Sequence, residues 1–164
     1  MMAEKRLVYA RTLCFVENGD DVLMLKGVPT KRLYANLYNG VGGHVEAGED
    51  ILSSMHREVR EETGLEIADA RLQAVVNVDE GGKPGVVFFV FTARSDSRQV
   101  RPSGEGQVSW IPRQCLMELD LVEDLRQLLP IVLDQRAGLW FGHLGYDAAG
   151  KLVSFQGRFG GEAP

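Results

Sequence analysis

The sequence contains few cysteines and no long apolar segment, and both absences narrow the possible classes of protein. Cys14 and Cys115 are its two cysteines, and they have neither the spacing of metal ligands nor the number needed for a disulfide framework, so we expect free, buried thiols. No apolar run reaches the length of a membrane span, and charges interrupt residues 1–6, where a signal peptide needs its apolar segment. We therefore expect a cytoplasmic protein without a membrane partner.

The sequence also lacks an excess of basic residues. Lysine and arginine number 18 against 23 acidic residues, which gives a formal net charge of -5. Sequence-independent binding of a nucleic acid polymer requires a basic surface, so we expect none. A small anionic substrate would need a cation to bridge it to such a protein. With 164 residues and 45% hydrophobic content, the chain is expected to form a single domain over residues 1–164.

Apolar, β-rich runs bounded by turn residues predict a sheet. Asn18-Gly19 predicts a hairpin between the first two runs, and Glu80 to Gly85 predicts a second between two later runs. Residues 86–93 are almost continuously apolar, which favours a central strand. The predicted strands are 7–15, 22–25, 72–78, 86–93, 108–111 and a closing pair at 139–146 and 151–155.

Two segments have helical periodicity. The first begins after Asp50, a residue type favoured at the N-cap, and ends at Gly64; Ile51, Leu52, Met55 and Val59 share the side expected to pack on the core. The second has apolar positions at helical spacing over 121–133 and contains Pro130, which favours a kink. Strands and helices together predict an α/β fold of the sandwich type.

Acidic residues cluster on the first predicted helix. Glu58, Glu61 and Glu62 lie three and four positions apart, so they share one strip, and at about 100° per residue Glu62 falls beside the apolar side. Grouped carboxylates at a partly buried position are costly unless protons or cations neutralise them, and oxygen ligands suit Mg²⁺ or Mn²⁺. The alternative is an exposed helix with ordinary ion pairs, for which Arg57 to Glu61 has the right spacing.

The spacing around this cluster resembles a known signature. The segment from Gly43 to Leu65 reads GHVEAGEDILSSMHREVREETGL and is similar at every specified position to the signature of the Nudix hydrolase family. Members share a mixed sheet between helices, with the signature forming a loop, a helix and a loop. The matching positions are Gly43, Glu49, Arg57, Glu58, Val59, Glu61, Glu62, Gly64 and Leu65.

The resemblance implies a role for each matching residue. Glu58, Glu61 and Glu62 would bind Mg²⁺ or Mn²⁺ together with the backbone carbonyl of Gly42. Arg57 and Glu49 would pair and hold the loop and the helix in register. Gly42 and Gly43 would let the backbone approach metal and phosphate closely, although glycines in a plain tight turn look the same. Many members supply one more acidic ligand from a later loop, and Glu105 is the candidate here.

The family splits a diphosphate linkage with an activated water. We favour Glu58 as the base that takes the proton from this water, with Glu61, Glu49 and Glu105 as the alternatives that the sequence leaves open.

Substrate-reading residues lie outside the signature. Asn39, which follows an aromatic residue and precedes the glycines, resembles the base-reading asparagine of MutT-like oxidised purine nucleoside triphosphatases. Glu123 and Asp124 resemble the acidic pair that opens the last helix of those enzymes, with Glu123 in place of their aspartate. An acidic pair at a helix start is equally explained by the helix dipole. The aromatic residues Trp110, Trp140 and Phe141 are expected in the core, and the three histidines have no ligand spacing.

The leading hypothesis is magnesium-dependent hydrolysis of a nucleoside triphosphate, including an oxidised purine nucleotide such as 8-oxo-dGTP, to the monophosphate and pyrophosphate. The alternatives are hydrolysis of another nucleoside diphosphate derivative, such as ADP-ribose or a nucleotide sugar, and a non-catalytic module that senses a ligand. The complete set of carboxylates argues against the last. We expect a small-molecule nucleotide as the binding partner.

Overall fold

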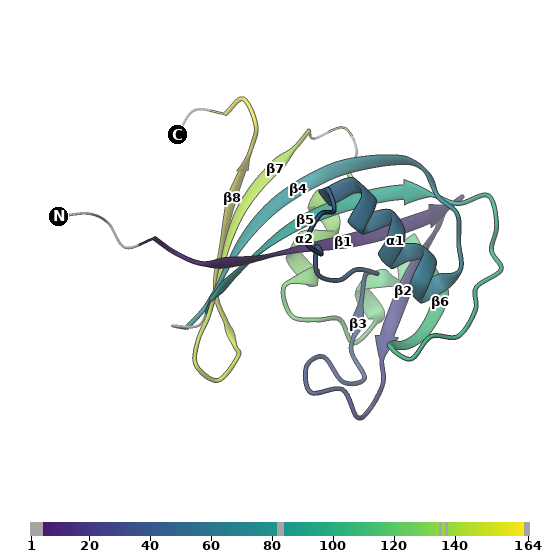
Figure 1. Ribbon diagram of the computed structural model, residues 1–164, viewed down its shortest axis with the longest axis horizontal. Coiled ribbons are helices and arrows are strands. Elements are labelled where there is room, and N and C mark those ends of the chain that lie inside the picture. The colour runs from purple at the N-terminus through teal and green to yellow at the C-terminus, as the bar shows by residue number, and fades with distance from the viewer. Residues whose placement is uncertain (1–4, 82–83, 135, 137, 163–164) are drawn as a thin grey trace.

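One twisted, mixed β-sheet forms the frame of the protein. The computed structural model describes residues 5–81, 84–134, 136 and 138–162. Eight strands are joined in the order β3-β2-β1-β5-β4-β7-β8, with β6 paired to β2 (Figure 1). The strands are β1 (Val8–Asn18), β2 (Asp21–Gly27), β3 (Tyr38–Asn39), β4 (Ala68–Glu80), β5 (Gly85–Arg94), β6 (Gly106–Pro112), β7 (Trp140–Tyr146) and β8 (Leu152–Phe159).

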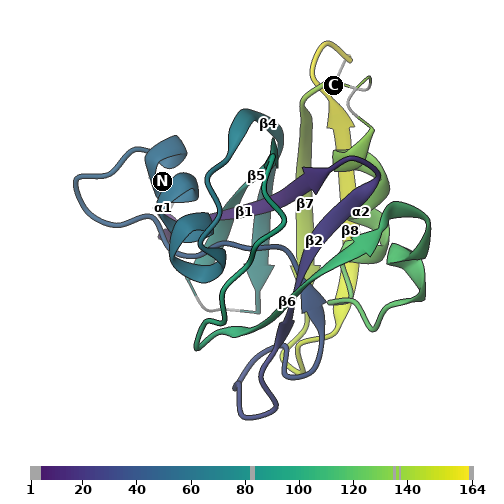
Figure 2. The same ribbon diagram turned by 90° about the vertical axis from the view of Figure 1, so that its right-hand side faces the viewer.

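Helices cover the sheet on opposite sides, which confirms the predicted fold class. The helices are α1 (Ile51–Thr63), the 3₁₀ helix η1 (Arg113–Glu118) and α2 (Leu125–Leu133). Figure 2 shows α1 on one side of β1 and α2 on the other. Because side chains alternate along a strand, Leu13 and Phe15 of β1 join the core under α2, whereas Cys14 and Val16 join the core under α1. The sheet therefore separates two hydrophobic cores.

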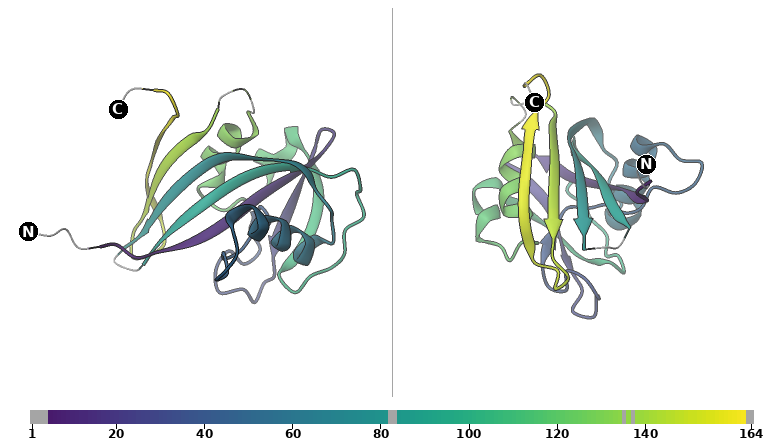
Figure 3. Two further views of the ribbon diagram at one scale, coloured as in Figure 1. Left: turned by 45° about the horizontal axis from the view of Figure 1, so that its top comes forward. Right: turned by 90° about the vertical axis from the view of Figure 1, so that its left-hand side faces the viewer.

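Two predicted hairpins extend the sheet. β4 pairs antiparallel with β5, and β7 pairs antiparallel with β8, as predicted (Figure 3). Gly82 and Lys83 of the predicted β4–β5 turn lie outside the described residues. Parallel pairing of β1 with β5 and of β4 with β7 makes the sheet mixed. Among the described residues, no helix has the length and apolar character required to cross a membrane.

The ends of α1 form as the sequence predicts. The Asp50 side chain accepts a hydrogen bond from the Ser53 backbone N–H at 2.9 Å, and Gly64 takes a left-handed conformation with φ 76°. Met55 and Val59 are fully buried, but the prediction for Leu52 is wrong, because 47% of this residue is exposed. Leu52 lies in the first turn at the rim of the apolar side, where the sheet no longer covers it.

Three other expectations need correction. The helix predicted from residue 121 begins at Leu125, because Leu121 instead forms a bridge with Tyr38, and the Val122 N–H donates to the Tyr38 carbonyl at 3.0 Å. Trp140 is buried as expected, but Phe141 is 46% exposed, since neighbouring residues of β7 face opposite sides. Cys14 is buried and Cys115 only partly so.

The N-cap gives a prediction about stability. Asp50→Ala removes the side chain that accepts the Ser53 N–H, so the free energy of unfolding should fall by about 1 kcal/mol. Urea unfolding followed by circular dichroism measures the change. Asp96→Ala, at an exposed position after β5, is the control and should leave the midpoint unchanged. Equal midpoints for Asp50→Ala and the wild type would contradict the capping role.

Candidate active site

The loop that precedes α1 is fastened to β1 by backbone hydrogen bonds. The Cys14 N–H donates to the Val41 carbonyl at 2.7 Å, and the Thr12 N–H donates to the Gly43 carbonyl at 2.9 Å. A Cβ on Gly42 would lie 2.0 Å from the Thr12 carbonyl oxygen, so only glycine permits this approach. Because the carbonyls on either side of Gly42 point toward β1, the extended backbone directs the Gly42 carbonyl away from β1.

The Glu58 carboxylate packs directly on Gly43. A Cβ at position 43 would lie 2.3 Å from Glu58 Oε1, so a side chain there would force the Glu58 carboxylate to move. Only 13% of the Glu58 side chain is exposed. The loop and the helix therefore meet at a carboxylate.

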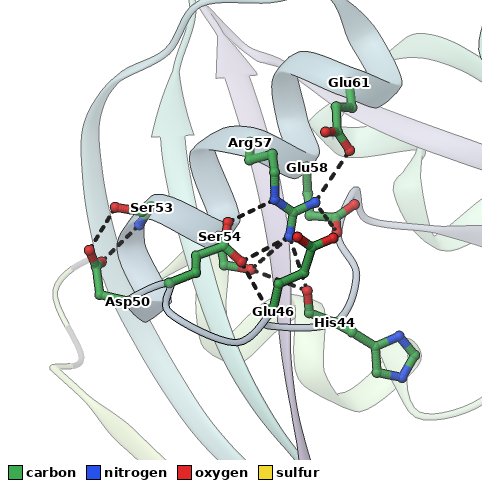
Figure 4. Close-up of polar contacts among 9 residues, drawn as sticks. His44, Glu46, Asp50, Ser53, Ser54, Arg57, Glu58 and Glu61 are labelled. Atoms are coloured by element: carbon green, nitrogen blue, oxygen red, sulfur yellow. Dashed lines mark hydrogen bonds and ion pairs between the residues drawn. The ribbon is translucent and has the colours of Figure 1, made fainter.

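Arg57 holds the loop and α1 together, as predicted. Its Nε and Nη2 donate to the two oxygens of Glu49 at 2.7 and 3.0 Å, and its Nη1 donates to Glu58 Oε1 at 2.8 Å. Nη2 also donates to the His44 carbonyl at 3.1 Å (Figure 4). Hydrogen bonding to Arg57 holds the pKa of Glu49 at about 2, with a contribution from the Glu46 N–H. Glu49 is consequently ionised at neutral pH and pairs bidentately with the guanidinium.

Glu62 is the buried acid of the site. Only 8% of the residue is exposed, and burial, with the negative charges of Glu58 and Glu105 next, raises its pKa to about 8. Its carboxyl accepts a hydrogen bond from the Gly42 N–H, which partly offsets this rise. The charges of Glu58 and Glu105 therefore lie near enough to Glu62 to affect its ionisation.

Glu61 departs from the predicted convergence. Its side chain is 59% exposed and accepts from Arg57 Nη1 at 3.3 Å, the spacing of the alternative ion pair considered above (Figure 4). Glu105 pairs with Lys31 at 2.7 Å. Among the described residues, no three acidic, histidine or cysteine side chains are grouped closely enough to hold a metal ion. Because carboxylates repel one another, Glu61 and Glu105 instead pair with nearby cations.

The family model named NUDIX domain matches residues 8–131, which include this loop, α1 and the loop of Glu105. The chain belongs to the Nudix family of hydrolases. The β7–β8 hairpin lies outside the matched range.

Relatives and solved structures agree with the Nudix assignment. The chain is 29% identical over 137 residues to the human 8-oxo-dGDP phosphatase NUDT18, covering 80% of this chain and 41% of that protein. It is 27% identical to the Nudix hydrolase YvcI of Bacillus subtilis, covering 88% and 91%. A crystal structure of a MutT protein from Bacillus halodurans shares the fold with a TM-score of 0.80 and 24% identity, covering 92% of this chain and 97% of that one. The chain thus spans about two fifths of the human relative.

The predicted substrate-reading residues of this Nudix protein lie on neighbouring backbone segments; the side chain of Asn39 is on the α1 face, because Asn39 pairs with Leu25 of the core under α1. Asn39 ends β3, where its Oδ1 accepts from the Gly40 N–H at 2.8 Å. The bridge between Tyr38 and Leu121 joins β3 to the segment that leads into α2. Glu123 and Asp124 directly precede α2, as predicted. The backbone thus brings the asparagine and the acidic pair to the same region.

The acidic pair does more than complement the helix dipole. Asp124 makes no side-chain capping bond; it accepts from the Tyr146 hydroxyl, and burial raises its pKa. Glu123 Oε2 accepts from the Leu152 N–H at 3.0 Å. Sequence reasoning missed Tyr146, because nothing in the local pattern indicates that the end of β7 lies beside the start of α2.

Of the aromatic residues expected in the core, Trp140 is buried and Trp110 is partly buried. The Trp110 Nε1–H donates to the Arg98 carbonyl at 3.0 Å, and Trp140 stacks on Phe155 with 5.3 Å between ring centroids. His143 bonds Asp79 at 2.7 Å, and both side chains are about half exposed. None of these residues lies among the signature carboxylates.

Burial of Glu62 gives a prediction about pH. Because its folded pKa exceeds its ordinary value of 4.5, the folded protein keeps a proton that the unfolded chain has already released, and stability falls as pH rises from about 4.5 to about 8. In EDTA, Glu62→Gln should therefore gain stability over the wild type between pH 5 and pH 8.5, by about 1 to 3 kcal/mol. Urea unfolding at the two pH values measures this difference.

Glu118→Gln is the matched control for the Glu62 variant. Glu118 is exposed at the end of η1, so its substitution should leave the dependence of stability on pH as in the wild type. A Glu62→Gln variant whose unfolding free energy varied with pH like that of the wild type would show that Glu62 is not a buried acid.

Proposed function

We propose that this Nudix protein hydrolyses a phosphoric anhydride bond of a nucleoside polyphosphate. The buried Glu62, set against Glu58 and Glu105 beside Gly42 and Gly43, is the observation that carries the proposal. A carboxyl group kept in a position where ionisation is costly does not serve stability, and functional sites concentrate such groups. For a triphosphate, the products are the monophosphate and pyrophosphate.

The donor atoms at this site suit a divalent cation in their chemistry, although among the described residues the acidic side chains are not gathered around one point. Every donor is an oxygen, which suits Mg²⁺ or Mn²⁺, and a cation would favour the ionised form of Glu62 that burial disfavours. Glu58, Glu61, Glu62 and Glu105, with the Gly42 carbonyl, are the residues that would hold it. When bound, such a cation neutralises phosphate oxygens and lowers the pKa of a water molecule.

Glu58 is proposed as the base. Its carboxylate takes a proton from water as the water oxygen bonds to phosphorus and the anhydride P–O bond breaks, so that the leaving phosphate departs with the electron pair. The Arg57 hydrogen bond at 2.8 Å and the packing on Gly43 fix the carboxylate in place. Glu49 acts through Arg57, because its two oxygens occupy one edge of the guanidinium.

A purine nucleotide, including an oxidised one, is the proposed substrate class. Asn39 offers an amide, and the partly buried Asp124 offers a carboxyl whose pKa is raised by burial. Glu123 lies beside it. The name of the human relative, an 8-oxo-dGDP phosphatase, supports the same class. Gly43 is proposed to let the phosphates approach the loop.

A substrate panel tests the proposal directly. With Mg²⁺ present, the protein should hydrolyse 8-oxo-dGTP or 8-oxo-dGDP in preference to dGTP, ADP-ribose and a nucleotide sugar, with the monophosphate as the common product. Chromatography and phosphate release identify the products. Preference for ADP-ribose or a nucleotide sugar would remove Asn39, Glu123 and Asp124 as base readers, and no hydrolysis of any compound would favour a non-catalytic ligand-sensing module.

Loss of the proposed base should strongly reduce turnover without unfolding the protein. Glu58→Gln keeps the shape of the side chain but removes its basicity, so kcat should fall by about 10²- to 10⁴-fold. Glu46→Gln changes an exposed acid of the same loop and should keep near-normal kcat. The melting temperature of each variant verifies folding. Near-normal turnover in Glu58→Gln would assign the base to Glu49, Glu61 or Glu105.

A further inference from the structure

Arg11 places a positive charge on the α2 side of the sheet. It is the neighbour of Phe88 in the pairing of β1 with β5, and its guanidinium carbon lies 5.6 Å from the centroid of the Phe88 ring. Side-chain alternation puts Arg11 on the same face as Leu13, whose core lies under α2. The planar guanidinium thus rests on an aromatic side chain next to the substrate-reading region.

The charge of Arg11 is not balanced within the described part of the chain. Its Nε is buried and has no hydrogen-bond partner, and no acidic side chain among the described residues forms an ion pair with it. Arg57 and Lys31, two cations near the carboxylates, are paired with glutamates. Holding a partly desolvated guanidinium without a counter-charge is unfavourable, and an anion bound beside it would offset that cost.

Arg11 adjoins the loop that carries Gly43. A backbone bridge joins Arg11 to His44, which directly follows the glycine on which Glu58 packs. On the other side, the pKa of Tyr34 is raised by burial and by Asp124, and Arg11 opposes that shift. Arg11 is therefore near both parts of the site.

We propose that Arg11 binds the phosphate that stays attached to the nucleoside after cleavage. This inference rests on the proposed function, which sets the reacting phosphate at Glu58 and the base at Asn39 and Asp124. In this proposal, a nucleotide that spans these two places would carry its first phosphate past Arg11. A guanidinium is suited to this role, because it can donate two parallel hydrogen bonds to one phosphate, while Phe88 supports its plane.

Binding of products in EDTA tests Arg11 without catalysis. Isothermal titration compares 8-oxo-dGMP, dGMP and AMP with the corresponding nucleosides, using the wild type, Arg11→Met and Arg11→Lys. The wild type should bind at least one monophosphate more tightly than its nucleoside. Arg11→Met, which keeps an unbranched apolar side chain on Phe88, should weaken the monophosphate by about 10- to 100-fold and leave the nucleoside unchanged. Arg11→Lys should retain part of the preference for the monophosphate over the nucleoside.

Arg71→Met is the matched control, because Arg71 is an exposed arginine on β4. It should bind all ligands like the wild type. For any substrate that the wild type hydrolyses, Arg11→Met should raise KM far more than it lowers kcat, since the contact exists before and during the reaction. Thermal melting verifies the fold of each variant. If Arg11→Met is unfolded, the comparison of Arg11→Lys with the wild type tests the role of Arg11.

The outcomes separate the two proposals. A wild type that binds no monophosphate more tightly than its nucleoside, or an Arg11→Met variant that keeps the wild-type preference, would overturn the role of Arg11. A wild type that hydrolyses no nucleotide but loses monophosphate binding on Arg11→Met would overturn the proposed hydrolysis and support the phosphate site.

Discussion

The bidentate pair of Arg57 with Glu49 is the interaction on which the arrangement of the site depends. Through it, a loop rich in glycine is tied to a helix that begins only after the loop has ended. The same guanidinium donates to Glu58, so one cation sets both the path of the backbone and the position of the proposed base. An exposed ion pair contributes little to stability, but this pair is mostly shielded and geometrically exact, which makes it a device for positioning.

The two faces of the sheet carry different parts of the proposed site. α1 packs on the face of Cys14 and Val16 and brings the acids to the loop, whereas α2 packs on the face of Leu13 and Phe15 and presents the acidic pair. Figure 3 shows how the hairpin of β7 and β8 extends the sheet beyond β4. Tyr146 of that hairpin reaches Asp124, so an element outside the matched family region contributes to the proposed reading of the base. Specificity can thus vary while the catalytic loop stays the same.

Local chemistry was predictable from the sequence, and long-range contacts were not. The cap at Asp50, the left-handed end at Gly64 and the pairing of Arg57 with Glu49 all depend on residues close together in the chain. Periodicity failed at Leu121, because a backbone bridge to distant Tyr38 competes with the helix, and at Leu52, because this residue lies at the rim of the apolar side of α1. Glu61 has the spacing of both a ligand and a partner of Arg57, and spacing alone does not distinguish the two.

Charge balance connects the remaining features of the site. The protein carries a net charge of -5 and gathers acids where an anionic substrate is proposed to react, an arrangement that repels the substrate unless cations intervene. A divalent ion can compensate for Glu58, Glu62 and Glu105 at one end. At the other end burial raises the pKa of Asp124. The proposed phosphate site at Arg11 would supply positive charge between these ends, because Arg11 forms no ion pair among the described residues and its strand is bridged to the loop at His44.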